Sequence, residues 1–295
     1  MHNHDALDYY TRHSRMTCPG RFASRIESLP EEVPTLVRII QGLALYDVVA
    51  DRFYGFNVPP ARTSEIHIRR VEGRLERLLE LDDRSLEFAR PPERRVLGRC
   101  HQFVLLLVTM LRSQGVPARA RCGFGAYFNR PKFEDHWVCE YWNVQERRWI
   151  LVDPQFDEAW RKRLGIRHDV LDVPRTQFLI AADAWQLCRQ GTFDPELFGI
   201  SFADLYGLWF IAGSLVRDMA ALNRMEMLPW DIWGVQPRRG QMLGTEQLSL
   251  FDELAHLTRD PDAMLVELQQ RYEADDRVRV PSTVFNALLK REEPV

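Results

Sequence analysis

The chain lacks any long apolar run. No segment approaches the roughly 18 uninterrupted apolar residues of a membrane-spanning helix, and the N-terminal residues Met1–Asp5 have no apolar stretch behind them. We therefore expect no membrane span and no targeting leader, and we expect a cytoplasmic protein.

Cysteine is also scarce. The chain of 295 residues holds five, an odd number without paired spacing, at Cys18, Cys100, Cys122, Cys139 and Cys188. This pattern excludes a disulfide framework and indicates reduced thiols. A free, reactive cysteine is tolerable in a reducing compartment.

The sequence has no excess of charge of either sign. It holds 39 basic and 42 acidic residues, so the formal net charge is −3. The basic cluster at 90–95 is broken by prolines, and the one at 161–163 lies between apolar residues; both are typical of solvated surface. The balance thus favours neither nucleic acid nor an anionic membrane as a partner. Internal repeats, low-complexity tracts and Gly/Ser-rich linkers are absent too, and 45% hydrophobic residues predict a substantial core.

One cysteine lies in a distinctive local setting. The segment Phe103–Leu111 is apolar almost all the way round at helical spacing, which predicts a buried helix over about 99–114 that ends at Gly115. Cys100 then lies on the first turn, where free N–H groups and the helix dipole can lower the pKa of a cysteine thiol by about one to several units. Gly98 would allow a sharp turn and the close approach of a substrate carbonyl.

Strands are expected to follow this helix, at 118–128, 136–142 and 148–152. The last two should pair as an antiparallel hairpin. If residues 143–146 form its loop, His136 directly faces Asp153, and opposed side chains have Cβ atoms about 4.5–5.5 Å apart. Asp153 would then fix the tautomer of the imidazole, whose second nitrogen addresses Cys100.

Alternatives to this arrangement exist. Glu134, Asp135 and Asp157 compete for the carboxylate role, but only Asp153 comes with a register that places it. Each member could also be structural, since free cysteine is among the most buried residue types.

The chain here resembles the transglutaminase-like superfamily, relatives of the papain-like cysteine proteases with catalytic residues in the order Cys, His, Asp. The resemblance covers roughly residues 95–156. The matching blocks are Gly98-Arg99-Cys100, Leu111-Arg112-Ser113-Gln114-Gly115-Val116-Pro117-Ala118-Arg119, Gly123-Phe124-Gly125, Asp135-His136-Trp137-Val138 and Trp149-Ile150-Leu151-Val152-Asp153-Pro154.

The resemblance implies an α+β fold with a papain/transglutaminase-like core, in which a buried helix bearing the cysteine packs on an antiparallel sheet bearing the histidine and aspartate. It implies Cys100 as nucleophile, His136 as general base and acid, and Asp153 as orienting acid. The reaction would be acyl transfer through a thioester, with release to water or to an amine. Gln41 is a candidate second donor of the oxyanion hole. His101 departs from many family members, which carry a charged or small polar residue there.

The substrate cleft has further candidates. Trp137 could shield the catalytic pair from water, Arg119 could bind a substrate carboxylate, and His101 could tune the site. The alternatives are core packing for Trp137, a surface salt bridge for Arg119 and a contact with another element for His101. Cys122 and Cys139 with nearby histidines invite a zinc site, but no Cys-x-x-Cys knuckle exists, so we expect neither a metal nor a cofactor.

The chain is expected to divide into three segments. Residues 1–84 form an N-terminal helical part of the core with helices at 31–53 and 66–81, 85–160 hold the catalytic motifs, and 161–295 form a helical extension packed on the core. The extension is expected to contain helices at 177–190, 202–223, 247–259, 263–274 and 282–291. Trp230 and Trp233 lie in a loop that could be a lid, a partner surface or simple packing.

These observations predict a cofactor-independent cysteine hydrolase or acyltransferase. Its substrate would be a peptide, a protein or a small amide, and the oligomeric state is left open. The alternative is a non-catalytic binding or scaffolding module that retains the fold, because one fold can host both.

Overall fold

The computed structural model describes the backbone of residues 2–295 and the side chains from residue 5 onward. The fold is mixed α+β, and the chain forms two compact units that are each built from distant segments. We call residues 8–120 and 138–173 the Cys100 unit, and residues 121–137 and 174–295, with the described residues up to Leu7, the His136 unit. Helix α1 (His2–Thr11) and strands β3 (Ala118–Asn129) and β4 (Lys132–Asn143) continue from one unit into the other. The three-segment division of the sequence stays a prediction.

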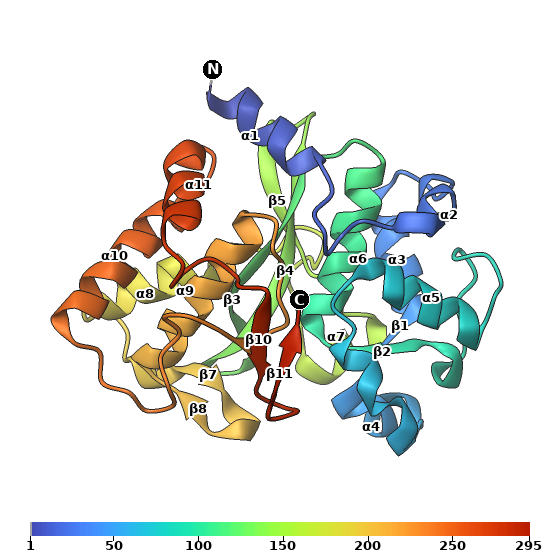
Figure 1. The fold of residues 1–295 in the computed structure, drawn as a ribbon. Helices are drawn as coiled ribbons and strands as arrows, with labels where there is room; N and C mark the ends of the chain where they lie inside the picture. Colours follow the sequence, from blue (N-terminus) through green and yellow to red (C-terminus); the bar gives the residue numbers. More distant parts are fainter. Residues whose placement is uncertain (1) are drawn as a thin grey trace. The chain divides into compact units, whose positions relative to one another are not determined.

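The Cys100 unit is built around helix α6 (Cys100–Ser113), as the apolar pattern predicts to within one residue at each end. Every side chain from Cys100 to Arg112 is buried. Helices α2 (Ala23–Glu27), α3 (Val33–Leu43) and α5 (Val71–Leu81) pack against α6 (Figure 1). The remaining helices of this unit are α4 (Ala50–Tyr54), α7 (Glu158–Leu164) and the 3-10 turns η1 (Gly20–Phe22), η2 (Asp47–Val49), η3 (Pro60–His67) and η4 (Pro92–Arg94).

A two-stranded parallel sheet leads the chain into α6. Strand β1 (Ala44–Tyr46) pairs with β2 (Val96–Gly98), with Tyr46 opposite Gly98. The prediction of one helix over 31–53 is therefore wrong. The chain leaves the helix at Leu43 because the next three residues form strand pairs, which the apolar spacing does not reveal. The helix predicted over 66–81 is likewise shorter, because η3 occupies the residues up to His67.

Strand β5 (Arg148–Val152) has the predicted bounds and pairs with β4, but the predicted register is wrong. Trp142 faces Trp149 and Asn143 faces Arg148, so the loop is 144–147 and the register is shifted by two residues. The cause lies in the turn. The side chain of Asn143 accepts hydrogen bonds from two loop N–H groups, and Arg147 adopts a left-handed conformation with φ 52°. Because the shift is even, the alternation of faces along β5 is kept.

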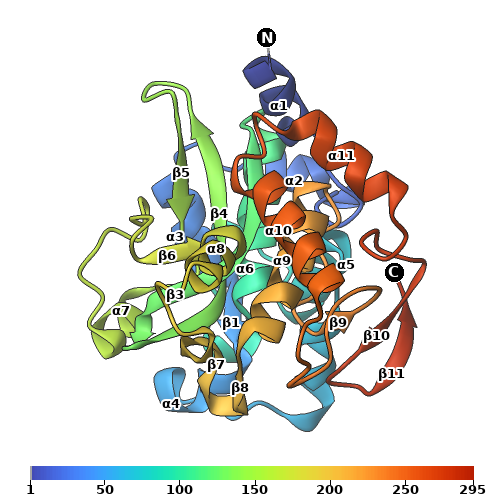
Figure 2. The same cartoon turned by 90° about the vertical axis from the view of Figure 1, so that its left-hand side faces the viewer.

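The His136 unit contains a sheet with the strand order β6-β3-β4-β7-β8. Its shorter strands are β6 (Phe178–Ile180), β7 (Phe198–Ile200) and β8 (Leu205–Tyr206), and 3-10 turns η5 (Pro195–Leu197) and η6 (Ser201–Ala203) flank β7. Helices α8 (Ala181–Arg189), α9 (Leu208–Leu222) and α10 (Thr245–Arg259) pack on one another, with α11 (Leu265–Ala274) following (Figure 2). None of the helices in the described chain has the length and apolar character that a bilayer crossing needs.

A three-stranded sheet ends the chain, where the pattern over 282–291 predicts a helix; that prediction is wrong. Strands β9 (Asp231–Ile232), β10 (Thr283–Asn286) and β11 (Arg291–Pro294) are adjacent in the order β11-β10-β9 (Figure 2). The Asn286 side chain accepts two N–H groups of the following turn, and Lys290 has φ 55°. These two residues turn the segment into a hairpin.

Candidate functional site

Cys100 is the first residue of α6 and is 7% exposed. The preceding residue, Arg99, has extended backbone and serves as the N-cap. Its N–H donates to the Gln102 side-chain oxygen at 2.7 Å, while the Gln102 amide donates to the Ile66 carbonyl at 2.6 Å. Gln102 thus ties the first turn of α6 to η3, and the cysteine lies at the positive end of a buried helix.

The Arg99 side chain is held by Asp47, which directly follows β1. Two hydrogen bonds join them, from Nε to Oδ1 at 3.0 Å and from Nη2 to Oδ2 at 3.1 Å. Burial works to lower the pKa of Arg99, but the bonds to Asp47 outweigh it and raise this pKa. A fixed positive charge therefore lies on the residue next to Cys100.

A buried polar cluster, which the sequence analysis does not identify, supports β2. We call Arg62, Glu65, Arg74 and Arg77 the Glu65 cluster. Glu65 accepts from Arg62 at 2.7 and 2.8 Å and from Arg77 at 2.9 Å. It also accepts from the Leu97 N–H at 2.8 Å, while Arg74 donates to the Leu97 carbonyl at 3.0 Å. The available signal was the unusual density of arginine between 62 and 77.

Gly98 has no room for a side chain. A Cβ built on it would lie 2.7 Å from Arg74 Nη2 and 3.2 Å from Gln102 Cβ. The place of a side chain is thus occupied by the Arg74 guanidinium, and the approach of a substrate carbonyl stays a prediction.

Asp153 directly follows β5 and is fully buried. Its N–H donates to the Val170 carbonyl at 2.8 Å, and its Oδ1 accepts from the Gln155 N–H at 3.2 Å. Gln41, from α3, donates through Nε2 to the Pro154 carbonyl at 3.3 Å. The structure therefore brings the candidate oxyanion donor beside the turn that carries the candidate orienting acid.

The three competing carboxylates have other partners. Asp157 caps α7 through the Trp160 N–H and accepts from the Tyr54 hydroxyl at 2.7 Å. Glu134 accepts from the Ser201 N–H at 2.9 Å. Asp135 lies 3.9 Å from Arg217, and burial, more than any charge, raises the pKa of Asp135 above its usual range. The observed β4–β5 register does not set His136 opposite Asp153, so the orienting role of Asp153 stays a prediction.

His168 lies in the same environment as Asp153 and was not identified from the sequence. Burial lowers the pKa of His168, while the negative charge of Asp153 opposes that shift. The histidine is therefore close enough to sense the carboxylate, although no motif marks it.

His136 lies on β4 in an aromatic surrounding and is 2% exposed. Its ring centroid is 4.9 Å from that of Phe128, 6.0 Å from Tyr127 and 6.4 Å from Phe178. Such packing restricts how the imidazole can rotate. Trp137, the next residue, is fully buried.

The predicted site residues fall into two groups. Cys100, Asp153, Gln41, His101 and Arg119 belong to the Cys100 unit, whereas His136 and Trp137 belong to the His136 unit. The meeting of thiol and imidazole stays a prediction.

Arg119 and His101 are interior residues. Arg119 donates to Glu140 at 2.7 Å, both side chains being at most 3% exposed, and its guanidinium lies 3.8 Å from the Trp149 ring centroid. His101 is fully buried. The structure thus places Arg119 in a buried ion pair, whereas the alternative weighed for it was a salt bridge at the surface.

The two candidate zinc-binding cysteines and the two tryptophans of the 228–234 loop are also in the interior. Burial raises the pKa of the Cys122 and Cys139 thiols, and the described residues contain no group of three or more metal-ligating side chains. Trp230 is 8% and Trp233 4% exposed, and the Trp233 indole donates to the Val278 carbonyl. Of the three readings of this loop, packing fits best.

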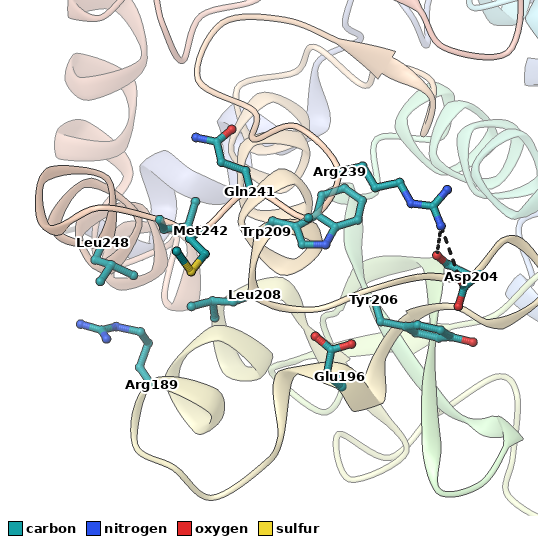
Figure 3. A pocket seen from close by; sticks show the side chains of 12 residues that line it. Arg189, Glu196, Asp204, Tyr206, Leu208, Trp209, Arg239, Gln241, Met242 and Leu248 are labelled. Carbon is teal, nitrogen blue, oxygen red and sulfur yellow. Dashed lines mark hydrogen bonds and ion pairs between the residues drawn. The ribbon is translucent and has the colours of Figure 1, made fainter.

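A surface pocket of about 540 Å³ lies within the His136 unit (Figure 3). Its apolar wall includes Leu208, Trp209 and Met242. Two arginines at its rim are already bound, Arg239 by Asp204 and Arg189 by Asp252. No sequence motif maps to this pocket.

Of three comparisons with known proteins, the one with family models agrees with the resemblance seen in the motifs. A search of curated proteins finds no match. Among solved structures, a protein from Cytophaga hutchinsonii described as a "putative cysteine protease" matches with 16% identity and a TM-score of 0.31, over 59% of this chain and 45% of that one. The match thus spans less than half the length of that protein.

A family model covers the motifs themselves. Residues 62–154 match the model of the transglutaminase-like superfamily, and this range includes Cys100, His136 and Asp153 together with the Glu65 cluster. The motifs of the sequence analysis therefore lie inside a segment that is similar to the core of the transglutaminase-like superfamily.

Proposed function

We propose that this protein is a cysteine-dependent hydrolase or acyltransferase that acts on an amide, peptide or isopeptide bond. Cys100 is the nucleophile, His136 the general base and acid, and Asp153 the residue that orients His136. The observation that carries the proposal is the place of Cys100, on the first residue of a buried helix inside the segment that matches the superfamily.

The local structure supports Cys100 as the reacting thiol. Cys100 begins a buried helix, where the N–H groups of the first turn have no partner within the helix. The Arg99 side chain beside it is fixed by its ion pair with Asp47. Cys122 and Cys139 have no such setting and are inert by comparison.

The reaction has two balanced steps. The Cys100 thiolate attacks the carbonyl carbon, the C–N bond breaks, and the imidazolium of His136 gives its proton to the departing amine. His136 then takes a proton from water or from an incoming amine, which attacks the thioester carbon, and the thiolate leaves. Protein side chains and the acceptor alone complete the cycle.

The oxyanion formed in each attack needs donors. The Cys100 N–H is one, and Gln41 supplies the other: one proton of its amide goes to the Pro154 carbonyl, which leaves the second for an oxyanion. We place the protein in the cytoplasm, where its thiol stays reduced.

Substrate screening with matched variants tests this function. Wild type, Cys100→Ala and Cys139→Ala are incubated with amide and ester libraries, and both hydrolysis and incorporation of a labelled amine are measured. We expect Cys100→Ala to abolish turnover and Cys139→Ala to keep it. Iodoacetamide gives a substrate-free measure: if Cys100 alkylates no faster than free cysteine near pH 7, the proposal is wrong and a binding module is favoured.

A further inference from the structure

We infer that Arg74 and Glu65 are positioning residues for Cys100, and that they fix the point where β2 ends and α6 begins. This inference rests on the proposed function, because it concerns the placement of the proposed nucleophile. All the residues involved lie in the Cys100 unit, and neither Arg74 nor Glu65 contains the reacting atoms.

The first support is that both polar main-chain atoms of Leu97 are held by charged side chains. Glu65 accepts the N–H at 2.8 Å and Arg74 donates to the carbonyl at 3.0 Å. Hydrogen bonds to ionised groups are shorter and stronger than neutral ones. Leu97 therefore cannot slide along β2 without breaking two of them, and Cys100 follows only three residues later.

The second support is steric. The Arg74 guanidinium occupies the place where a side chain of residue 98 would stand, 2.7 Å from an ideal Cβ. Arg74 also donates to the Glu65 carbonyl at 3.3 Å, so its own position is fixed. The path of the chain through Gly98 is thus set by contact with a buried, anchored group.

The third support is that the far end of the turn is tied to the same structure. Gln102 donates to the carbonyl of Ile66, the neighbour of Glu65, and accepts from the Arg99 N–H. The turn from Leu97 to Gln102 is therefore held at both ends by η3 and α5, and the cysteine lies between the two anchors.

Energetics argue that this cluster serves more than stability. Arg74 is 1% exposed, and burial lowers its pKa to about 10 against the opposing charge of Glu65. Replacing a buried ionic cluster by apolar side chains of similar volume often leaves stability unchanged or improved. What apolar groups cannot supply is directional bonding to one main-chain N–H and one carbonyl.

The test compares two buried arginines of the same unit. Arg74→Met removes the group beneath Gly98, while Arg112→Met removes one at the other end of α6 that donates to the Tyr10 and Ala118 carbonyls. Mass spectrometry follows alkylation of Cys100 by iodoacetamide between pH 6 and 9, and circular dichroism verifies folding. Hydrogen exchange is followed for the peptide spanning 97–103.

We expect Arg74→Met to slow alkylation by about ten-fold, because the thiol loses its fixed place at the start of the helix, and to speed exchange over 97–103. Arg112→Met should lower the melting temperature but keep the alkylation rate within about two-fold of wild type. Equal effects of both variants, or a wild-type rate and exchange pattern in Arg74→Met, would overturn the inference. Arg74→Lys, which keeps the charge, is the substitute if Arg74→Met does not fold.

Gly98→Ala isolates the steric part. It should slow alkylation in wild type and have little further effect in the Arg74→Met background, where the space is free. Failure of the proposed function can be distinguished from failure of this inference. If the proposed function is wrong, wild-type Cys100 reacts no faster than free cysteine. The difference in hydrogen exchange between Arg74→Met and Arg112→Met still shows whether the Glu65 cluster holds the turn.

Discussion

The guanidinium of Arg99 and the carboxylate of Asp47 face each other with two hydrogen bonds of 3.0 and 3.1 Å, and the pair joins the end of β1 to the start of α6. The side chains are 21% and 17% exposed, so water screens the pair only in part.

Asp47→Ala should therefore lower the free energy of unfolding by about 1–2 kcal/mol and slow alkylation of Cys100, because Arg99 loses its anchor. Urea unfolding and iodoacetamide kinetics measure the two effects. Asp51→Ala, an exposed neighbour on α4, is the control and should change neither. Equal stability of Asp47→Ala and wild type would show that the pair is energetically neutral.

Arg119→Met should lower the free energy of unfolding by about 3–5 kcal/mol, because it removes the counter-ion of the buried Glu140 carboxylate. The double variant Arg119→Met/Glu140→Leu should recover most of that loss. Denaturant titration of the four proteins gives the coupling energy. A raised KM in Arg119→Met with unchanged stability would instead restore the prediction that Arg119 binds substrate.

Gly123→Ala should destabilise the His136 unit by about 1–3 kcal/mol. An added Cβ would lie 2.2 Å from the Leu179 carbonyl oxygen on the neighbouring strand β6, so the two strands would have to separate. Thermal unfolding measures the loss. Gly244→Ala is the control for added bulk: nothing lies within 4 Å of the added atom, and the loss should be limited to the roughly 1 kcal/mol of replacing glycine by alanine at the N-cap of α10.

Stability should fall as the pH drops below about 6.5, the ordinary pKa of histidine. Burial, with the Arg112 charge, lowers the pKa of His13, and burial also lowers that of His168. The unfolded chain then binds more protons than the folded one, so the stabilisation present above the ordinary value is lost as pH falls through the folded values. Melting temperatures from pH 8 to 5 measure this slope.

His13→Gln keeps a hydrogen-bonding group beside Ser113 and should make that slope shallower. His256→Gln, on the outer face of α10, is the control and should leave the slope unchanged. A slope equally steep in His13→Gln would mean that other groups dominate.

The local sequence pattern was sufficient to predict the bounds of a helix or strand wherever that element buries a single apolar surface. The bounds of α6 and β5 follow from apolar spacing, from Gly115 and from turn residues, because those signals act over a few neighbouring positions. The catalytic roles of Cys100, His136 and Asp153 stay a prediction.

The errors occur where a side chain bonds back to its own turn. Asn143 and Asn286 each accept two loop N–H groups, which moved the β4–β5 register and made a hairpin of the predicted last helix. The Glu65 cluster escaped prediction for a different reason: its members meet Leu97 only through folding, and an arginine-rich helix otherwise resembles a solvated surface.

The discontinuous make-up of the two units bears on biosynthesis. The Cys100 unit cannot be completed until residue 173 has been synthesised, because it also needs residues 138–173. Residues 121–137 of the His136 unit pack with residues 174–295, which are synthesised later. A ribosome-bound intermediate must therefore expose apolar side chains of β3 and β4 for part of translation. Truncation within residues 121–173 removes part of both units, so it should yield aggregating protein and not a smaller folded domain.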